Sequence, residues 1–350
     1  MVQLQSMKII HTADVHLDSP LVGVANATTR RHELLTALMR LNEYANNNGV
    51  QAIVVAGDLF DENSVSDQTI RSVADIVKSG TASWFVLKGN HGGSAPYEKL
   101  AKLCPDVHFF GDTWTKYNLD GVTICGRELG VNDEAEWSNL SLDKSSYNVL
   151  VLHGDVDDPA YGLIDKKAIA NSGANYVALG HRHAFAAQKF GSVKGCYCGV
   201  LEARGFDETA DTGCVLIDTD ADTIRFVPLA IRKVENVVLD VSNISSDIAL
   251  QNKISDVVAE TSPRNYLNLV LTGQADTDLH VEMVARQALE GKFFALRVKD
   301  ATTLKIDLQA LSEEISLRGE FVKLASEIQD EKLRNAVLKM GLNYLNGEVK

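Results

Sequence analysis

The feature that most restricts the fold is a short apolar run that ends in a polar cluster, repeated along the chain. Three such runs lie within residues 7–91, and segments with apolar residues at helical spacing separate them. Strands that alternate with helices through short links predict a parallel sheet built from βαβ units. Two more runs of the same design follow at 149–152 and 176–179. Because the carboxyl ends of parallel strands meet at one edge of a sheet, we expect the polar clusters to gather there.

These clusters contain residue types that bind metal ions. In chain order the candidate ligands are Asp14, His16, Asp58, Asn90, His153, His181 and His183. Two carboxylates, one amide oxygen and four imidazoles suit Mn²⁺, Fe²⁺ or Zn²⁺ better than a thiolate-rich structural zinc site. Seven ligands exceed the needs of one ion and fit two ions that share a carboxylate. For the Gly180–His183 stretch taken alone, a solvated turn with two histidines is the alternative.

Charge and cysteine content narrow the function classes. The net charge of −13 argues against a chain that holds nucleic acid by its own basic surface. It permits an enzyme that meets phosphate through bound cations, or one whose partner supplies the DNA contacts. No stretch approaches the ~18–20 apolar residues of a membrane span, and we expect no signal peptide. Five cysteines without a disulfide pattern favour reduced thiols and a cytoplasmic location.

The sequence pattern changes towards the C-terminus. The short strand patterns that follow Gly180, through Val227, indicate antiparallel pairing. After Arg232, residues 233–306 alternate strand-like and helix-like segments and predict a small α/β domain. Residues 307–350 predict a helical tail with an apolar series at Leu308, Leu311, Ile315, Phe321, Leu324 and Ile328. We therefore expect three regions, 1–232, 233–306 and 307–350.

Five motifs occur in an order that resembles the calcineurin-like metallophosphoesterases. They are D-x-H at 14–16, G-D-x-x-D at 57–61, G-N-H at 89–91, H-G at 153–154 and G-H-x-H at 180–183. Residues 11–20, 56–62 and 198–208 also resemble the DNA-repair exonuclease branch of SbcD and YhaO-type nuclease subunits. The resemblance implies a four-layer α-β-β-α metallophosphoesterase sandwich with a smaller α/β C-terminal domain and a helical tail. It also implies that 233–306 caps the site or binds DNA and that 307–350 docks a partner.

The resemblance further implies a role for each ligand. Asp14, His16 and His183 would hold one metal, Asn90, His153 and His181 the second, and Asp58 would bridge them. The expected ions are Mn²⁺ first, with Fe²⁺ or Zn²⁺ as alternatives. His91 would face the scissile phosphate as a catalytic residue.

The implied activity is metal-dependent cleavage of DNA phosphodiesters in repair or processing. It would be a 3′–5′ exonuclease with added endonuclease activity. The implied partners are DNA and an SMC-like coiled-coil ATPase, and the segment 67–78 could form a homodimer.

One departure from the family pattern concerns His91. The family usually has an acid directly after this histidine, whereas this chain has Gly92. We hypothesise that Asp61 supplies the missing carboxylate and is a second catalytic residue. The alternative is that Asp61 only caps the turn that follows it.

Two other functions compete with the nuclease. A phosphoesterase on small molecules or cyclic nucleotides is slightly favoured by the negative charge. A metal-binding scaffold that has lost catalysis would explain Gly92, although all seven ligand positions are filled.

Overall fold

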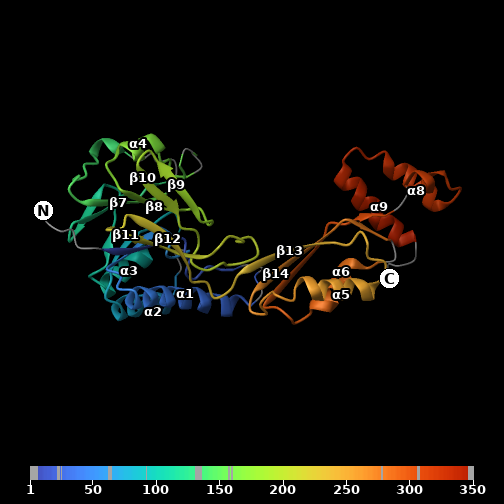
Figure 1. The fold of residues 1–350 in the computed structure, drawn as a ribbon, viewed down its shortest axis with the longest axis horizontal. Helices are drawn as coiled ribbons and strands as arrows, with labels where there is room; N and C mark the ends of the chain where they lie inside the picture. Colours follow the sequence, from blue (N-terminus) through green and yellow to red (C-terminus); the bar gives the residue numbers. More distant parts are fainter. Residues whose placement is uncertain are drawn as a thin grey trace. The chain divides into compact units, whose positions relative to one another are not determined.

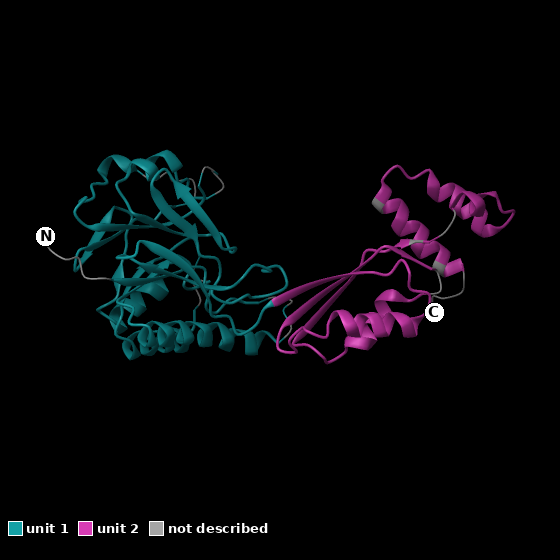
Figure 2. Cartoon of the chain, viewed as in Figure 1, with its two compact units in different colours: residues 1–233 teal, residues 234–350 magenta. Residues whose placement is uncertain are grey.

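The computed structural model describes residues 7–21, 24, 26–61, 65–91, 93–130, 136–156, 158, 161–276, 279–305 and 308–345. Contacts divide the chain into two compact units, 1–233 and 234–350 (Figure 2). The segment 307–350, expected as a separate region, lies in the same unit as 234–306. Within the described residues, none of the helices has the length and apolar character that crossing a bilayer requires.

The first unit contains two six-stranded sheets (Figure 1). The first sheet has the order β12-β11-β1-β2-β3-β4. Its strands are β1 (Lys8–Thr12), β2 (Ala52–Ala56), β3 (Ser83–Leu87), β4 (His108–Phe109), β11 (Gly213–Asp218) and β12 (Thr223–Pro228). β1 to β4 pair in parallel, as the alternation of strands and helices predicts. β11 pairs antiparallel with both β1 and β12.

The second sheet has the order β5-β6-β7-β8-β10-β9. Its strands are β5 (Thr115–Leu119), β6 (Val122–Gly126), β7 (Tyr147–His153), β8 (Tyr176–Gly180), β9 (Ala186–Phe190) and β10 (Val193–Tyr197). The expectation of antiparallel pairing after Gly180 is wrong for β10, which pairs in parallel with β8. β9 lies at the sheet edge and forms a hairpin with β10, so the chain turns back and β10 runs beside β8 in the same direction.

Helices cover the outer faces of both sheets and complete four layers, which confirms the predicted fold class. α1 (Ala27–Asn47), α2 (Asp67–Ser79) and α3 (Ala95–Leu103) pack on the first sheet. α4 (Lys166–Asn171) and the short 3₁₀ helix η1 (Trp137–Asn139) pack on the second. Figure 1 shows α1 to α3 and α4 on opposite sides of the paired sheets.

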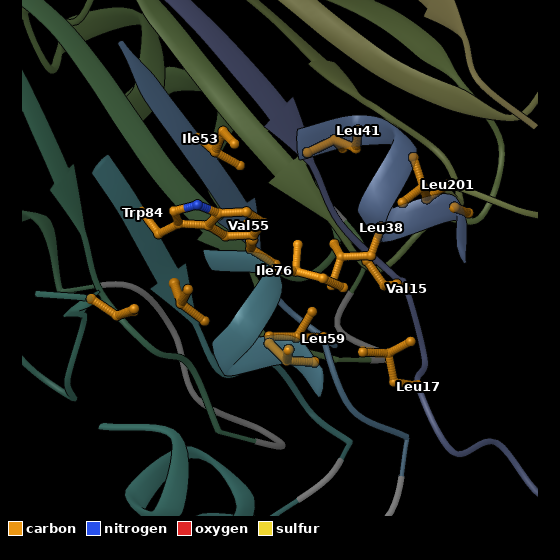
Figure 3. Packing of buried hydrophobic residues seen from close by; sticks show 14 of the residues in the cluster. Val15, Leu17, Leu38, Leu41, Ile53, Val55, Leu59, Ile76, Trp84 and Leu201 are labelled. Atoms are coloured by element: carbon orange, nitrogen blue, oxygen red, sulfur yellow. The ribbon is translucent and has the colours of Figure 1, made fainter. Parts of the chain in front are cut away.

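Alternation along the strands accounts for this layering. Ile53 and Val55 of β2 point towards the helices, whereas Val54 points towards the second sheet. Figure 3 shows the helix-facing layer, in which Leu38 of α1 and Trp84 of β3 belong to the same buried cluster. Strands buried on both faces read as continuous apolar runs, which is why the sequence predicted them clearly.

The second unit is a small α/β structure with a helical end. Its parallel sheet has the order β13 (Val234–Asp240), β14 (Tyr266–Thr272), β16 (Ala295–Asp300). α5 (Asp247–Val257) and α6 (Val281–Leu289) share its apolar core. A two-stranded ladder joins β15 (Gln274–Ala275) and β17 (Thr303–Leu304), and α7 (Leu308–Glu313), α8 (Leu317–Ser326) and α9 (Glu331–Leu345) follow.

The helical end differs from the single apolar series expected from the sequence. Leu311 is buried among α7, α8 and α9, but Ile315 and Leu324 are exposed. Ile315 lies between α7 and α8, outside any helix. The breaks between α7, α8 and α9 change the direction in which successive apolar side chains point, so these side chains do not all lie on one helix face.

Candidate metal centre

The loops that follow β1, β2 and β3 are joined by backbone hydrogen bonds. The amide of Asp14 donates to the carbonyl of Gly57 at 3.1 Å, and that of His16 donates to the carbonyl of Asp58 at 2.9 Å. The amide of Asp58 donates in turn to the carbonyl of Lys88 at 2.8 Å. These bonds hold the first three motifs of the sequence next to one another.

Backbone strain is concentrated at the same residues. Asp14, His16 and Asp58 have φ angles of 51°, 49° and 52°, and His181 has a φ of 98°. For residues other than glycine, this left-handed region costs on the order of 1–3 kcal/mol each and persists only where the surroundings enforce it. Four of the seven predicted ligands are therefore held in conformations that the surrounding fold imposes.

Two glycines let the ends of the two sheets approach. Gly57 has a φ of 102°, and a Cβ there would lie 2.0 Å from Nδ1 of His153. A Cβ at Gly180 would lie 1.9 Å from the carbonyl oxygen of Ala56. A side chain at either position would separate donors of the first sheet from those of the second.

The structure brings all seven predicted ligands into one cluster. Donor atoms of Asp14, His16 and His183 lie within 4.8 Å of one another, and so do those of Asp14, Asp58 and His153. Asn90 joins the remaining donors.

Oδ1 of Asn90 lies 2.7 Å from Nε2 of His153 and 3.2 Å from Nδ1 of His181. Asp14 and Asp58 are buried, whereas His181 is partly exposed.

The geometry of His153 fits a bound cation. Its Nδ1 lies 2.9 Å from the carbonyl oxygen of Ala56, which can only accept, so Nδ1 carries a proton. Its Nε2 faces two further acceptors, Oδ1 of Asn90 and, at 3.2 Å, Oδ2 of Asp58. Nε2 and these two oxygens are all acceptors, and a proton or a metal cation between them removes the repulsion.

The pKa values of this group show how strongly a positive charge is favoured. Burial lowers the pKa of His153, but the carboxylates of Asp58 and Asp14 outweigh burial and raise it to about 9. Burial raises the pKa of Asp58, but the charge of His153 and its hydrogen bond bring it down to about 2. A divalent cation would take the place of the shared proton, because metal ligands must be deprotonated.

A second pair of imidazoles completes the cluster. Nε2 of His16 lies 3.2 Å from Nε2 of His183. The Nδ1 atoms of both rings face carboxylates, Asp61 at 2.7 Å and Glu208 at 3.0 Å. The carboxylate at Nδ1 of His16 favours the tautomer that leaves Nε2 free to bind a metal. Nδ1 of His183 also lies 3.1 Å from a terminal nitrogen of Arg204.

Sequence analysis missed the groups that orient the imidazoles of the G-H-x-H motif. Glu208 faces His183, and Asp155 lies with Oδ2 3.4 Å from Nε2 of His181. Burial raises the pKa of Glu208, but the hydrogen bond from His183 and the charge of Arg204 lower it to about 2. A usable signal existed, because Asp155 directly follows the H-G motif and Glu208 ends the stretch 198–208.

His91 lies beside the cluster and is more exposed than the ligands, with a side-chain exposure of 46%. Its amide donates to Oδ1 of Asp58 at 2.8 Å. Its Nδ1 lies 3.3 Å from the carbonyl oxygen and 3.5 Å from the carboxylate of Asp61. The same carboxylate also faces His16, so Asp61 lies between a predicted ligand and the predicted catalytic histidine. Gly92 lies outside the described residues.

A family model described as calcineurin-like phosphoesterase matches residues 7–185, which is just over half of the 350 residues. The chain belongs to this family. That assignment confirms the resemblance drawn from the five motifs and establishes a metallophosphoesterase. The Asp and His groups described above fit the divalent cations that the family uses.

Among curated proteins, the chain is 25% identical over 349 residues to the uncharacterized metallophosphoesterase YhaO of Bacillus subtilis. The match covers 88% of this chain and 85% of YhaO. The chain is 24% identical to the DNA double-strand break repair protein Mre11 of Aeropyrum pernix, over 67% of this chain and 64% of that protein. The Mre11 protein of Methanosarcina mazei is 21% identical over 97% of this chain and 55% of its own length. The chain thus spans less than two thirds of these Mre11 proteins. Among solved structures, a novel archaeal phosphodiesterase is 16% identical over 63% of this chain and 99% of its own, with a TM-score of 0.40.

Proposed function

We propose that this metallophosphoesterase is a DNA nuclease, a 3′–5′ exonuclease with added endonuclease activity in DNA repair or processing. The main support is the match to proteins named for DNA double-strand break repair, which extends over 97% of this chain in one case. Such a match includes the second unit, which a phosphoesterase domain alone does not need.

The proposed metal ligands follow the clusters in the structure. One subsite comprises Asp14, His16 and His183, the other Asn90, His153 and His181, with Asp58 shared. We infer that both hold Mn²⁺, with Fe²⁺ or Zn²⁺ as alternatives, because the donors are oxygen and imidazole nitrogen. When bound, two such cations would polarise a phosphoryl oxygen and lower the pKa of a bound water molecule to about 7.

His91 is the proposed proton donor to the leaving oxygen. With Nδ1 directed at the carbonyl oxygen of Asp61, Nε2 is the nitrogen left to meet the substrate. Its half-exposed ring lets a large substrate reach it. Burial raises the pKa of Asp61, but His16, Ser19 and Arg204 together outweigh burial, and the net pKa is lowered. The ionised carboxylate would fix the His91 ring, which is the role proposed for the acid missing at position 92.

The proposed macromolecular partners are DNA and an SMC-like coiled-coil ATPase. The helical end of the second unit offers exposed apolar side chains for such a partner, namely Leu317, Leu324, Leu333, Met340 and Tyr344. The α/β part of that unit would cap the site or bind DNA. A homodimer through α2 is the further proposal, and light scattering on the purified chain tests it.

A cytoplasmic location is proposed from the cysteines. All five have free thiols and are buried in the first unit. A reducing compartment maintains that state.

The experiment compares two substrates in the presence of Mn²⁺. Duplex DNA labelled at the 5′ end and bis-p-nitrophenyl phosphate are each incubated with the protein, with and without chelator, and with His91→Ala as control. Stepwise shortening from the 3′ end that requires Mn²⁺ and His91 supports the proposal. Hydrolysis of the small ester alone would overturn it and favour a small-molecule phosphoesterase. Inactivity on both substrates with two Mn²⁺ bound would favour a scaffold without catalysis.

A further inference from the structure

Arg204 lies between two carboxylates of the metal centre and has no part in the mechanism above. Its Nε and one terminal nitrogen donate to Oε1 of Glu208 at 2.9 and 2.7 Å, and the same terminal nitrogen lies 3.1 Å from Nδ1 of His183. Its other terminal nitrogen lies 3.5 Å from Oδ1 of Asp61. The side chain is 21% exposed, so solvent screens these interactions only in part.

These two carboxylates face the two imidazoles of one metal subsite. Asp61 faces Nδ1 of His16 and Glu208 faces Nδ1 of His183, and the two Nε2 atoms lie 3.2 Å apart. The contacts therefore form a closed ring that starts and ends at Arg204. A guanidinium is planar and carries five donors, so it can engage two carboxylates at once in a fixed geometry.

We propose that Arg204 is a positioning residue for the His16–His183 metal subsite. It fixes both carboxylates, which in turn hold the two imidazoles so that their Nε2 atoms converge on a single cation. The inference rests on the metal centre of the proposed function. Loss of partners in this outer shell of a metal site typically weakens metal affinity by about 10–100-fold.

The other subsite has a separate arrangement of the same kind. Nε of Arg182 donates to Oδ1 of Asp155 at 2.7 Å, and Oδ2 of Asp155 faces His181. The Arg182 side chain is 46% exposed and lies over the ring of Tyr197, with 5.1 Å to the centroid. Among the described contacts, none joins this group to the ring around Arg204. Arg182 is therefore the matched comparison for Arg204.

A purely structural role for Arg204 makes a different prediction. Its backbone amide also donates to Oε2 of Glu208 at 2.7 Å, so the side chain could serve only to hold the turn 204–208. In that case Arg204→Gln would lower the stability of the metal-free chain and would change Mn²⁺ affinity to the same degree at both subsites.

The test is titration of the full-length chain with Mn²⁺ by calorimetry, together with electron paramagnetic resonance of the bound ions. His183→Ala and His181→Ala identify which binding event belongs to which subsite. Arg204→Gln is expected to weaken the event that His183→Ala removes by about 10–100-fold and to leave the other within a factor of about three. Arg182→Gln is expected to weaken the event that His181→Ala removes and to leave the other within the same factor. The signal of the coupled Mn²⁺ pair should appear at higher Mn²⁺ concentration in both variants.

Two further variants test the route of the effect. Arg204→Lys is not expected to restore affinity, because an ammonium cannot engage both carboxylates in the same plane. In the Arg204→Gln background, Glu208→Gln should weaken Mn²⁺ binding less than it does in the parent chain, since Arg204 and Glu208 contact each other and the same Nδ1 of His183. Full additivity of the two losses would contradict the proposed route.

The outcome is independent of DNA cleavage. A chain that binds two Mn²⁺ with the expected pattern but leaves DNA intact would refute the nuclease and keep this inference. A chain that cuts DNA while Arg204→Gln binds both ions as the parent does would refute this inference and keep the nuclease. Fewer than two Mn²⁺ bound by the parent chain would refute the two subsites themselves.

Discussion

Replacing Arg30 by methionine is expected to destabilise the first unit strongly, because it leaves a buried carboxylate without its cation. The Arg30 side chain is fully buried, and one terminal nitrogen lies 2.9 Å from Oε1 of Glu202, whose side chain is also fully buried. The guanidinium also donates to the carbonyl of Ala203 and pairs with Glu33. Arg30 lies in α1 and Glu202 follows β10, so the contact joins a helix over the first sheet to a loop after the second.

The expected loss follows from the burial of both groups. Removing one partner of a buried ion pair costs about 3–5 kcal/mol. Glu202 keeps two backbone donors in the variant, the amides of Ile231 at 2.5 Å and Arg232 at 3.2 Å. These bonds favour the lower half of that range, about 3–4 kcal/mol.

The pH dependence has a definite sign. Burial raises the pKa of Glu202 above its ordinary value of 4.5, and Arg30 opposes that shift. Without Arg30 the pKa rises further. A carboxyl with a raised pKa binds protons more readily in the folded state, so its protonation stabilises that state as pH falls. The destabilisation of Arg30→Met should therefore shrink between pH 7 and pH values near 5.

The assay is urea unfolding followed by tryptophan fluorescence. All three tryptophans, Trp84, Trp114 and Trp137, lie in the first unit, so the signal reports that unit alone. Arg31→Met is the matched control in the same helix, because the Arg31 side chain is not fully buried and donates only to the carbonyl of Pro20 among the described contacts. Its effect should stay within about 0.5 kcal/mol. Equal stability of the two variants, or a difference that does not change with pH, would refute the reasoning.

Four further outcomes follow from the site. Gly57→Ala should abolish Mn²⁺ binding in calorimetry, because its Cβ would meet His153 at 2.0 Å and its φ of 102° disfavours a side chain; retained affinity would contradict this. His91→Ala should lower kcat for DNA cleavage by about 10²–10⁴-fold with Mn²⁺ affinity unchanged, because it removes the proposed proton donor and none of the proposed ligands. Asp61→Asn should lower both kcat and Mn²⁺ affinity, since the carboxylate faces His91 and His16. A change in kcat alone would show that the contact between Asp61 and His16 does not contribute to Mn²⁺ binding. Mn²⁺ at about 100 times its Kd should stabilise the first unit by about 2.7 kcal/mol in the fluorescence assay, and no shift would exclude selective binding to the folded state.

The clustering of the proposed ligands was predictable from the sequence because each lies at the end of an apolar run that is buried on both faces. The end of such a strand is set by hydrophobicity, and the ends of parallel strands meet by geometry. Asp14, Asp58 and Asn90 therefore fall at one edge of the first sheet without further information. Their order along the chain then matches the order of strands in that sheet.

The orienting carboxylates were not predictable in the same way. Glu208 and Asp155 lie in loops, where acidic residues are common and have no periodicity. Their approach to His183 and His181 depends on how the loops pack. Strand pairing had the same limit, since the short runs between Gly180 and Val227 predict strands but do not identify β8 as the parallel neighbour of β10.

The division of the donors between the two sheets explains why the centre needs the whole first unit. Asp14, Asp58 and Asn90 follow strands of the first sheet, whereas His153 ends β7 and His181 follows β8 in the second. Each proposed subsite takes donors from both sheets, because His183 meets His16 across the interface, and His153 and His181 meet Asn90. Cation binding is therefore coupled to the packing of one sheet on the other, and any change that separates the sheets, even far from the ligands, acts on both subsites at once.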